Sequence, residues 1–217
     1  MWTSSRRSFL LTSGAALLAA PAQQIVDTHI HLYDPTRKQG VPWPPKNDSL
    51  LYKPVLPGRY EAMVRPLGVT GTIVVEASAW LEDNQWILDL ARERPFILGF
   101  VGHLEPGTNE FRQHLARFNR NPLFRGIRVN GNAISAGVSK LEFLEDIRRL
   151  ADAGLMMDAI GNATMVPGLL RLIEAIPKLR IAIDHMPGEP PGWTERRNEI
   201  RELAKHLQVY SKVSGVV

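Results

Sequence analysis

Two histidines separated by a single residue are the strongest chemical signal in this 217-residue sequence. His29 and His31 follow an apolar start and precede a proline-rich stretch. Alternate residues of a β-strand point to the same face, so Asp27, His29 and His31 are expected to share one face. Imidazole nitrogens are common ligands of zinc and other divalent metals. The spacing therefore predicts half of a metal site, with a pair of surface-exposed histidines as the alternative.

Three more polar side chains fall at the carboxyl ends of predicted strands. Glu76 ends an apolar strand, where an ionised carboxylate is costly unless it is paired or bound to metal. His103 ends the next strand and either lines the same mouth or is solvated. Arg128 is placed to hold a substrate carboxylate or a lactone carbonyl, whereas Arg125 is expected to be structural. Glu76 and His103 are thus candidate substrate-binding residues, and Arg128 is a candidate catalytic residue.

The elements that must position these residues alternate between short apolar runs and amphipathic stretches. Runs bounded by Gly, Pro or Asp predict seven strands, at residues 25–31, 71–76, 96–101, 124–129, 155–160, 179–184 and 208–213. Helices are predicted at residues 85–94, 110–119, 140–153, 165–176 and 194–207. Asp83 or Asn84 is expected to cap the first helix, and Gly154 to end the third. Such strand–helix units imply parallel strands joined by right-handed crossovers.

This alternation fits either an open doubly wound sheet or a closed (β/α)₈ barrel of the TIM type. No glycine-rich nucleotide-binding motif follows the first strand, so the nucleotide fold loses its main support. We therefore expect an α/β fold of the (β/α)₈ TIM-barrel type. The proline-rich residues 33–58, which include Trp43, are expected to form a long ordered loop. It either arches over the barrel mouth, where active sites lie, or is a surface excursion without a role.

The barrel is expected to stop after its seventh strand. Removing 22 residues from 217 leaves 195, against about 250 in a typical eight-unit barrel. The sequence is then a fragment, the product of an early stop, or a variant closed in another way, for example as a homo-oligomer. An open last strand exposes unpaired backbone groups and invites such association. We would not expect this chain alone to be a competent enzyme.

The composition and the first 22 residues describe an exported globular domain. Hydrophobic residues make up 44% and charged residues 22%, and the absence of cysteine excludes disulfides and thiolate metal sites. Arg6 and Arg7, a short apolar run and the small residues 20–22 resemble a twin-arginine signal peptide, which predicts a periplasmic domain over residues 23–217. The run is shorter than the roughly 20 residues that span a bilayer, so the mature protein is not expected in a membrane.

The charge balance excludes one class of partner. The formal net charge is +4, and it falls to about +2 without Arg6 and Arg7. The remaining Lys and Arg residues are scattered rather than clustered, so neither a nucleic acid nor an anionic membrane is the expected partner. A small-molecule substrate remains.

Five sequence blocks resemble the amidohydrolase-related family, the branch of metal-dependent (β/α)₈ hydrolases that includes sugar-lactone hydrolases and some decarboxylases. The blocks are residues 25–32, 124–128, 154–158, 183–188 and 209–215. They have the order and spacing of that family and cover essentially the whole mature chain. The resemblance is specific for the family and uninformative about the substrate.

The resemblance implies roles for individual residues. His29 and His31 would be metal ligands on the first strand, and His185, at the end of the sixth, a ligand or general base. An imidazole there can take a proton from water near neutral pH, although a core histidine is the alternative. Some relatives carry a metal-binding His where Asp158 stands, which leaves Asp158 as a substrate-binding candidate and a binuclear site in doubt. An aspartate expected on an eighth strand would lie beyond Val217.

These observations predict an exported metal-dependent hydrolase of a small substrate, either a lactone or a related ester or amide. A divalent ion, with zinc expected, would be held by His29, His31 and His185, and Arg128 would orient the substrate. A decarboxylase on the same scaffold is the nearest alternative. The second alternative is a catalytically inactive, exported binding domain.

Overall fold

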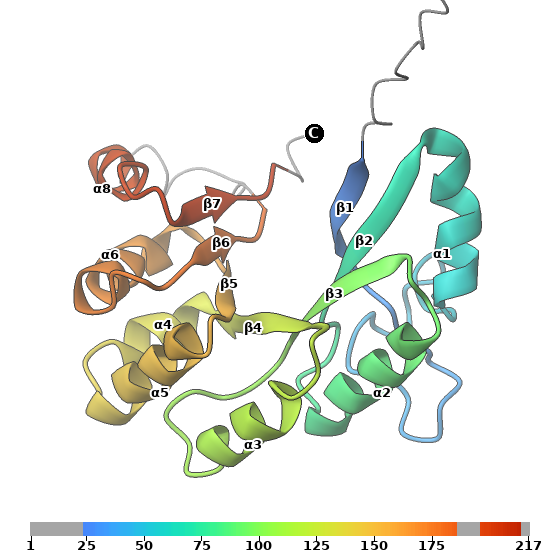
Figure 1. Cartoon of the computed structure of the whole chain (residues 1–217), viewed down its shortest axis with the longest axis horizontal. Coiled ribbons are helices and arrows are strands. Elements are labelled where there is room, and N and C mark those ends of the chain that lie inside the picture. Colours follow the sequence, from blue (N-terminus) through green and yellow to red (C-terminus); the bar gives the residue numbers. More distant parts are fainter. Residues whose placement is uncertain (1–23, 186–195, 214–217) are drawn as a thin grey trace, which may run out of the picture.

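A computed structural model describes residues 24–185 and 196–213 of the chain. In these residues seven parallel strands form one sheet in the order of the sequence, from β1 to β7. Figure 1 shows the sheet curling into part of a barrel, with the helices on its outer side. The expectation of a TIM-barrel-type α/β fold is confirmed. The predicted signal peptide, residues 1–22, lies outside the described residues.

The strands are short and lie close to the predicted ranges. They are β1 (Ile25–Ile30), β2 (Val69–Val75), β3 (Ile97–Gly102), β4 (Phe124–Asn130), β5 (Met156–Ile160), β6 (Ile181–Ile183) and β7 (Val209–Ser211). The α-helices are α1 (Pro57–Val64), α2 (Leu81–Arg92), α3 (Phe111–Phe118), α4 (Gly131–Gly137), α5 (Leu141–Asp152), α6 (Val166–Ala175) and α8 (Arg197–Leu203). Two 3₁₀ turns precede β2 and α6, at Arg65–Leu67 and Ala163–Met165. No helix in this part of the chain is long and apolar enough to cross a membrane.

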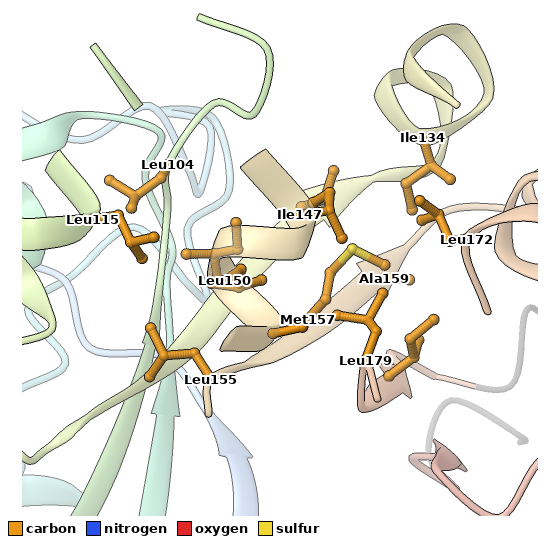
Figure 2. Close-up of a cluster of buried hydrophobic side chains, with 14 of the residues drawn as sticks. Leu104, Leu115, Ile134, Ile147, Leu150, Leu155, Met157, Ala159, Leu172 and Leu179 are labelled. Carbon is orange, nitrogen blue, oxygen red and sulfur yellow. The ribbon is translucent and has the colours of Figure 1, made fainter. Parts of the chain in front are cut away.

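The hydrophobic core lies between the sheet and the outer helices. Met157 and Ala159 of β5 have no exposed surface and face this layer, where they meet side chains of α5 and α6 such as Ile147 and Leu172 (Figure 2). Side chains alternate along a strand, so Asp158, between them, faces the barrel interior. The same alternation puts hydrophobic residues behind the sheet and polar residues inside the barrel.

Three helical features differ from the sequence prediction. Helices α1 and α4 were not expected, because Pro57, Gly58 and the glycine-rich segment of α4 weaken the helical signal. Helix α2 begins at Leu81, and no side chain caps it, so the expectation that Asp83 or Asn84 is the cap is wrong. Both residues are buried in the first turn, where Asp83 binds Arg37 and Asn84 binds the backbone of His103. Gly154 does follow α5, with a φ of 73° that glycine adopts without strain.

A register irregularity in β1 corrects the expected side-chain pattern. The pairing of β1 with β2 shifts between Asp27 and Ile30, and such a bulge breaks the strict alternation of faces. The Asp27 carboxylate consequently accepts a hydrogen bond from the Tyr60 hydroxyl of α1 at 2.6 Å. Asp27 therefore does not share the face of His29 and His31. Its Oδ1 also accepts the backbone N–H of His29 at 3.1 Å, which fixes the turn of the chain into the histidine pair.

The long loop over residues 33–56 is ordered by contacts at both ends. Tyr33 pairs with Val55 as an isolated antiparallel bridge. Arg37 donates to the buried Asp83 of α2 at 2.7 Å, and its guanidinium lies over the Trp86 ring. These contacts hold the loop against the carboxyl ends of the first strands. Of the two expected arrangements, this is the loop that arches over the barrel mouth.

The close contact between β4 and β5 gives a testable consequence. A β-carbon at Gly126 would lie 2.2 Å from the Met156 carbonyl oxygen, so Gly126→Ala is expected to lower the free energy of unfolding by about 1–3 kcal/mol. Gly58→Ala is the matched control, because its β-carbon would meet nothing within 4 Å. Urea unfolding of both variants checks this. Equal stability of the two would contradict the strand packing.

Candidate active site

Three imidazoles from opposite ends of the sequence converge at the carboxyl ends of β1 and β6. The Nε2 atoms of His29 and His31 lie 3.3 Å apart. The ring of His185, which follows β6, has its centroid 4.7 Å from that of His29. The residues expected to bind metal are thus brought together, and the parallel strand order is what places them at one rim.

The tautomer of His31 follows from its backbone contact. Its Nδ1 lies 2.9 Å from the Val75 carbonyl oxygen, which can only accept, so Nδ1 carries the proton. The Nε2 atom of neutral His31 then presents a lone pair toward His29. Burial lowers the pKa of His31, with the Arg128 charge acting in the same direction, which favours this neutral form.

His29 is held against a buried carboxylate. Its Nδ1 lies 3.5 Å from Oδ1 of Asp184, whose side chain has no exposed surface. A proton on Nδ1 would face this oxygen and leave the Nε2 lone pair directed at His31. Burial lowers the pKa of His29 to about 3, and this loss of solvation outweighs the opposing attraction of Asp184. His29 is therefore neutral near pH 7, the state that a metal ligand requires.

This donor set fits a zinc-like ion. Two Nε2 lone pairs that face each other at 3.3 Å repel unless a cation or proton lies between them. Nitrogens bound to one zinc at about 2.0–2.1 Å with a tetrahedral angle lie about 3.3 Å apart. The described residues hold no complete cage of three or more His, Asp or Glu side chains, so His29 and His31 offer two ligands and His185 is the adjacent imidazole.

The backbone of His185 is in an unusual conformation. Its φ is 60°, in the left-handed region that only a few per cent of non-glycine residues adopt. Such strain costs about 1–3 kcal/mol and concentrates at functional sites. The turn directs the chain sharply after β6 and brings the imidazole beside that of His29.

Arg128 is committed to neighbouring carboxylates. Its Nε donates to Glu76 Oε1 at 2.8 Å and its Nη2 to the Glu76 backbone oxygen at 2.6 Å. Its Nη1 lies 3.6 Å from Asp184 Oδ2. Arg128, expected to hold a substrate carboxylate or a lactone carbonyl, thus has its Nε and Nη2 engaged by Glu76, although its side chain also lines the cleft. The Glu76 carboxylate, at the end of an apolar strand, forms an ion pair with Arg128.

Lys212, one residue beyond β7, is a site residue to which the sequence prediction gave no role. Its Nζ lies 2.8 Å from Asp184 Oδ1 and donates to Asp158 Oδ2. Burial raises the pKa of Asp158 to about 6, helped by the nearby Asp184 and opposed by Lys212. Asp158, a candidate substrate-binding residue, binds Lys212 and lines a cleft that does not include His31 or His185. The position of Lys212 directly after the last predicted apolar run is the feature of the sequence that could have identified it.

An open cleft of about 370 Å³ leads to the histidines. Its lining residues are His31, Trp43, Ala77, Arg128, Ile160 and His185. The Trp43 ring meets that of His31 edge-on, with centroids 5.3 Å apart, so the ordered loop contributes an aromatic wall. Polar groups at the floor and apolar groups on the walls are typical of a small-molecule site.

His103 lies elsewhere. Both its backbone N–H and its carbonyl are bound by the side chain of Asn84, at 2.9 and 2.8 Å. The His103 ring lines a separate cleft of about 320 Å³ between the starts of α2 and α3, together with Glu105 and His114. His103 was expected either to line the same mouth as His31 or to be solvated, and its ring lines this separate cleft instead.

The fold and the site together indicate the class of protein to which the chain belongs. A curled sheet of parallel strands with imidazoles at the carboxyl ends of β1 and β6 is the arrangement of TIM-barrel proteins whose histidines gather at the mouth. The family model described as Amidohydrolase matches residues 26–217. The chain belongs to the amidohydrolase family, as its sequence blocks suggested.

Known proteins resemble the chain at two levels. An L-fucono-1,5-lactonase of Burkholderia ambifaria is 28% identical over 201 residues, which are 88% of this chain and 67% of that protein. A zinc-bound amidohydrolase from Burkholderia multivorans shares 20% identity, with a TM-score of 0.77 over 90% of this chain and 71% of that one. A manganese-bound 5-carboxyvanillate decarboxylase from Novosphingobium aromaticivorans shares 14% identity, with a TM-score of 0.64 over 89% of this chain and 79% of that one. The two structures show a common fold.

The burial of neutral His29 predicts how stability depends on pH. Its folded pKa of about 3 lies below the 6.5 of the exposed group, so the unfolded chain binds the proton first. This group's stabilising contribution is complete above pH 6.5 and is lost as the pH falls toward 3. His29→Gln should therefore flatten the acid side of the stability curve of the metal-free protein.

Chemical unfolding at a series of pH values measures this difference. Asp158 acts in the opposite sense, because the stability contributed by its raised pKa is complete below pH 3.8 and is lost as the pH rises to about 6. That contribution is present in both proteins and cancels in the comparison. His114→Gln, on α3, is the control and should keep the wild-type slope. An unchanged slope in His29→Gln would contradict the burial of a neutral His29.

Proposed function

We propose that this protein is a metal-dependent hydrolase of a small, uncharged lactone. The convergence of His29, His31 and His185 at the mouth of the barrel is the observation that carries the proposal. The similarity to an L-fucono-1,5-lactonase supports a lactone as the substrate class, and the zinc-bound structure with the same fold supports zinc as the ion.

The residues of the site divide the work of ester hydrolysis. His29 and His31 would hold a divalent ion, which would supply a Lewis acid for the lactone carbonyl. His185, beside this pair, accepts a proton from the attacking water as the new carbon–oxygen bond forms. The ring carbon–oxygen bond then breaks, and the same proton goes to the departing alkoxide, which gives the hydroxy acid. The Trp43 wall and Ile160 restrict the pocket to a compact ring.

The two cations beside the mouth are already paired with carboxylates. Arg128 is shared by Glu76 and Asp184, and Lys212 by Asp158 and Asp184. In this network two cations therefore meet three carboxylates, so both cations are already paired, and a divalent ion at His29 and His31 would add its own charge of +2. A substrate carboxylate would have to bind that ion or displace a buried ion pair, which costs about 3–5 kcal/mol when one partner is stranded.

Decarboxylation is the second candidate, because a decarboxylase shares this fold. The two reactions consume different substrates and release different products. Lactone hydrolysis releases a proton without carbon dioxide, whereas decarboxylation releases carbon dioxide from an acid. The paired state of Arg128 favours hydrolysis, because a decarboxylase must bind a carboxylate.

Zinc-loaded protein should hydrolyse a neutral aldonolactone faster than a lactone that carries carboxylates, followed with a pH indicator. His185→Gln is expected to lower kcat by about 10²–10⁴-fold, the usual contribution of a general base. His114→Gln, which lies in the separate cleft, should keep the wild-type rate. Carbon dioxide release from an aromatic acid without lactone hydrolysis would favour the decarboxylase, and preference for the charged lactone would refute a neutral substrate.

A further inference from the structure

Lys212 carries the only ammonium group that the described part of the barrel interior places on Asp184. Its Nζ lies 2.8 Å from Asp184 Oδ1 and also donates to Asp158 Oδ2. Neither carboxylate side chain has any exposed surface, and 14% of the Lys212 side chain is exposed. One ammonium group thus ties together the ends of β5, β6 and β7.

The two oxygens of Asp184 have different cationic neighbours. Oδ1 is the atom that faces both Lys212 Nζ and His29 Nδ1, the latter at 3.5 Å. Oδ2 lies 3.6 Å from Arg128 Nη1. Because the cations lie on opposite oxygens, the carboxylate is clamped, and Oδ1 stays turned toward His29. Without Lys212, only Arg128 would pull on the group, in the direction of Oδ2.

We propose that Lys212 is a positioning residue for His29. It holds the Asp184 carboxylate so that Oδ1 receives the Nδ1 side of the imidazole, which leaves Nε2 turned to His31. This inference rests on the proposed metal site. Carboxylates that orient a metal-binding histidine typically contribute 10–100-fold in metal affinity. Lys212 is not among the residues that line the cleft, and its closest contacts in the site are Asp184 and Asp158, so we expect it to act through Asp184.

A purely structural role for Lys212 makes a different prediction. If Lys212 only balanced the buried charge of Asp158 and Asp184, removing one carboxylate together with the lysine would restore the site. If Lys212 holds Asp184 in place, that double substitution would restore the charge balance without restoring the position of Asp184. The two roles are therefore separable by a compensating variant.

The experiment measures the zinc affinity of the metal-free full chain by competition with a chromogenic chelator, without substrate. Lys212→Met should weaken zinc binding by about 10–100-fold. Lys212→Arg, which keeps a cation, should recover part of the loss. Lys205→Met is the matched control, because Lys205 forms an exposed ion pair with Glu202, and it should bind zinc like the wild type.

The compensating variant Lys212→Met with Asp158→Leu decides the case even if Lys212→Met alone does not fold. Leucine has the branched shape of aspartate but cannot donate to Asp184, and a buried ion pair replaced by apolar groups often leaves stability unchanged. The double variant should fold and still bind zinc about 10-fold or more weakly. Wild-type affinity in the double variant, or in Lys212→Met, would overturn the role of Lys212 alone. A wild-type protein that binds no zinc would overturn the metal site and this inference with it.

Discussion

The Asp184 carboxylate is fully buried at the mouth of the barrel, and ionised groups in such a place cost several kcal/mol unless cations reach them. Two different elements supply the compensating cations, Arg128 from β4 and Lys212 after β7, and neutral His29 of β1 lies beside the same carboxylate. These groups can meet at one carboxylate only if the sheet curls. The buried charge of Asp184 can therefore be compensated only in a curled sheet.

This constraint also sets the chemistry of the mouth. Because Lys212 and Arg128 are engaged by carboxylates, the histidines are left as the neutral, nucleophilic nitrogens of the site. Burial keeps them neutral, the Val75 carbonyl orients Nδ1 of His31, and Nδ1 of His29 lies 3.5 Å from Oδ1 of Asp184 without a hydrogen bond. A pair of neutral imidazole nitrogens in this cleft suits a divalent metal ion.

The sequence predicted the features that depend on periodicity and on strand ends. Apolar runs located the seven strands, and parallel order then required His29, His31 and His185 to meet at one rim, as they do. Helix α1 was missed because a proline and a glycine open it. The capping argument failed at α2 because Asp83 binds Arg37 of the loop and Asn84 binds the backbone of His103, just after β3, instead of the helix amides.

Pairings between distant residues could not be predicted in the same way. Arg128 and Glu76 are 52 residues apart, and Lys212 and Asp158 are 54 apart, so no local pattern announces either contact. The Asp27 error has a different cause: strict alternation fails at a bulge, which depends on the pairing of β1 with β2. Lys212 was nevertheless within reach, because a lysine directly after an apolar strand raises the same burial question as Glu76.

The central claim is that the facing Nε2 atoms of His29 and His31 bind a divalent ion. Anomalous diffraction at the zinc absorption edge, from crystals of the full chain grown with zinc, locates such an ion directly. The account predicts one strong peak within bonding distance of both Nε2 atoms, with the Nδ1 atoms still directed at Asp184 and Val75. Strong peaks confined to surface histidines such as His206, with none at this pair, would contradict it.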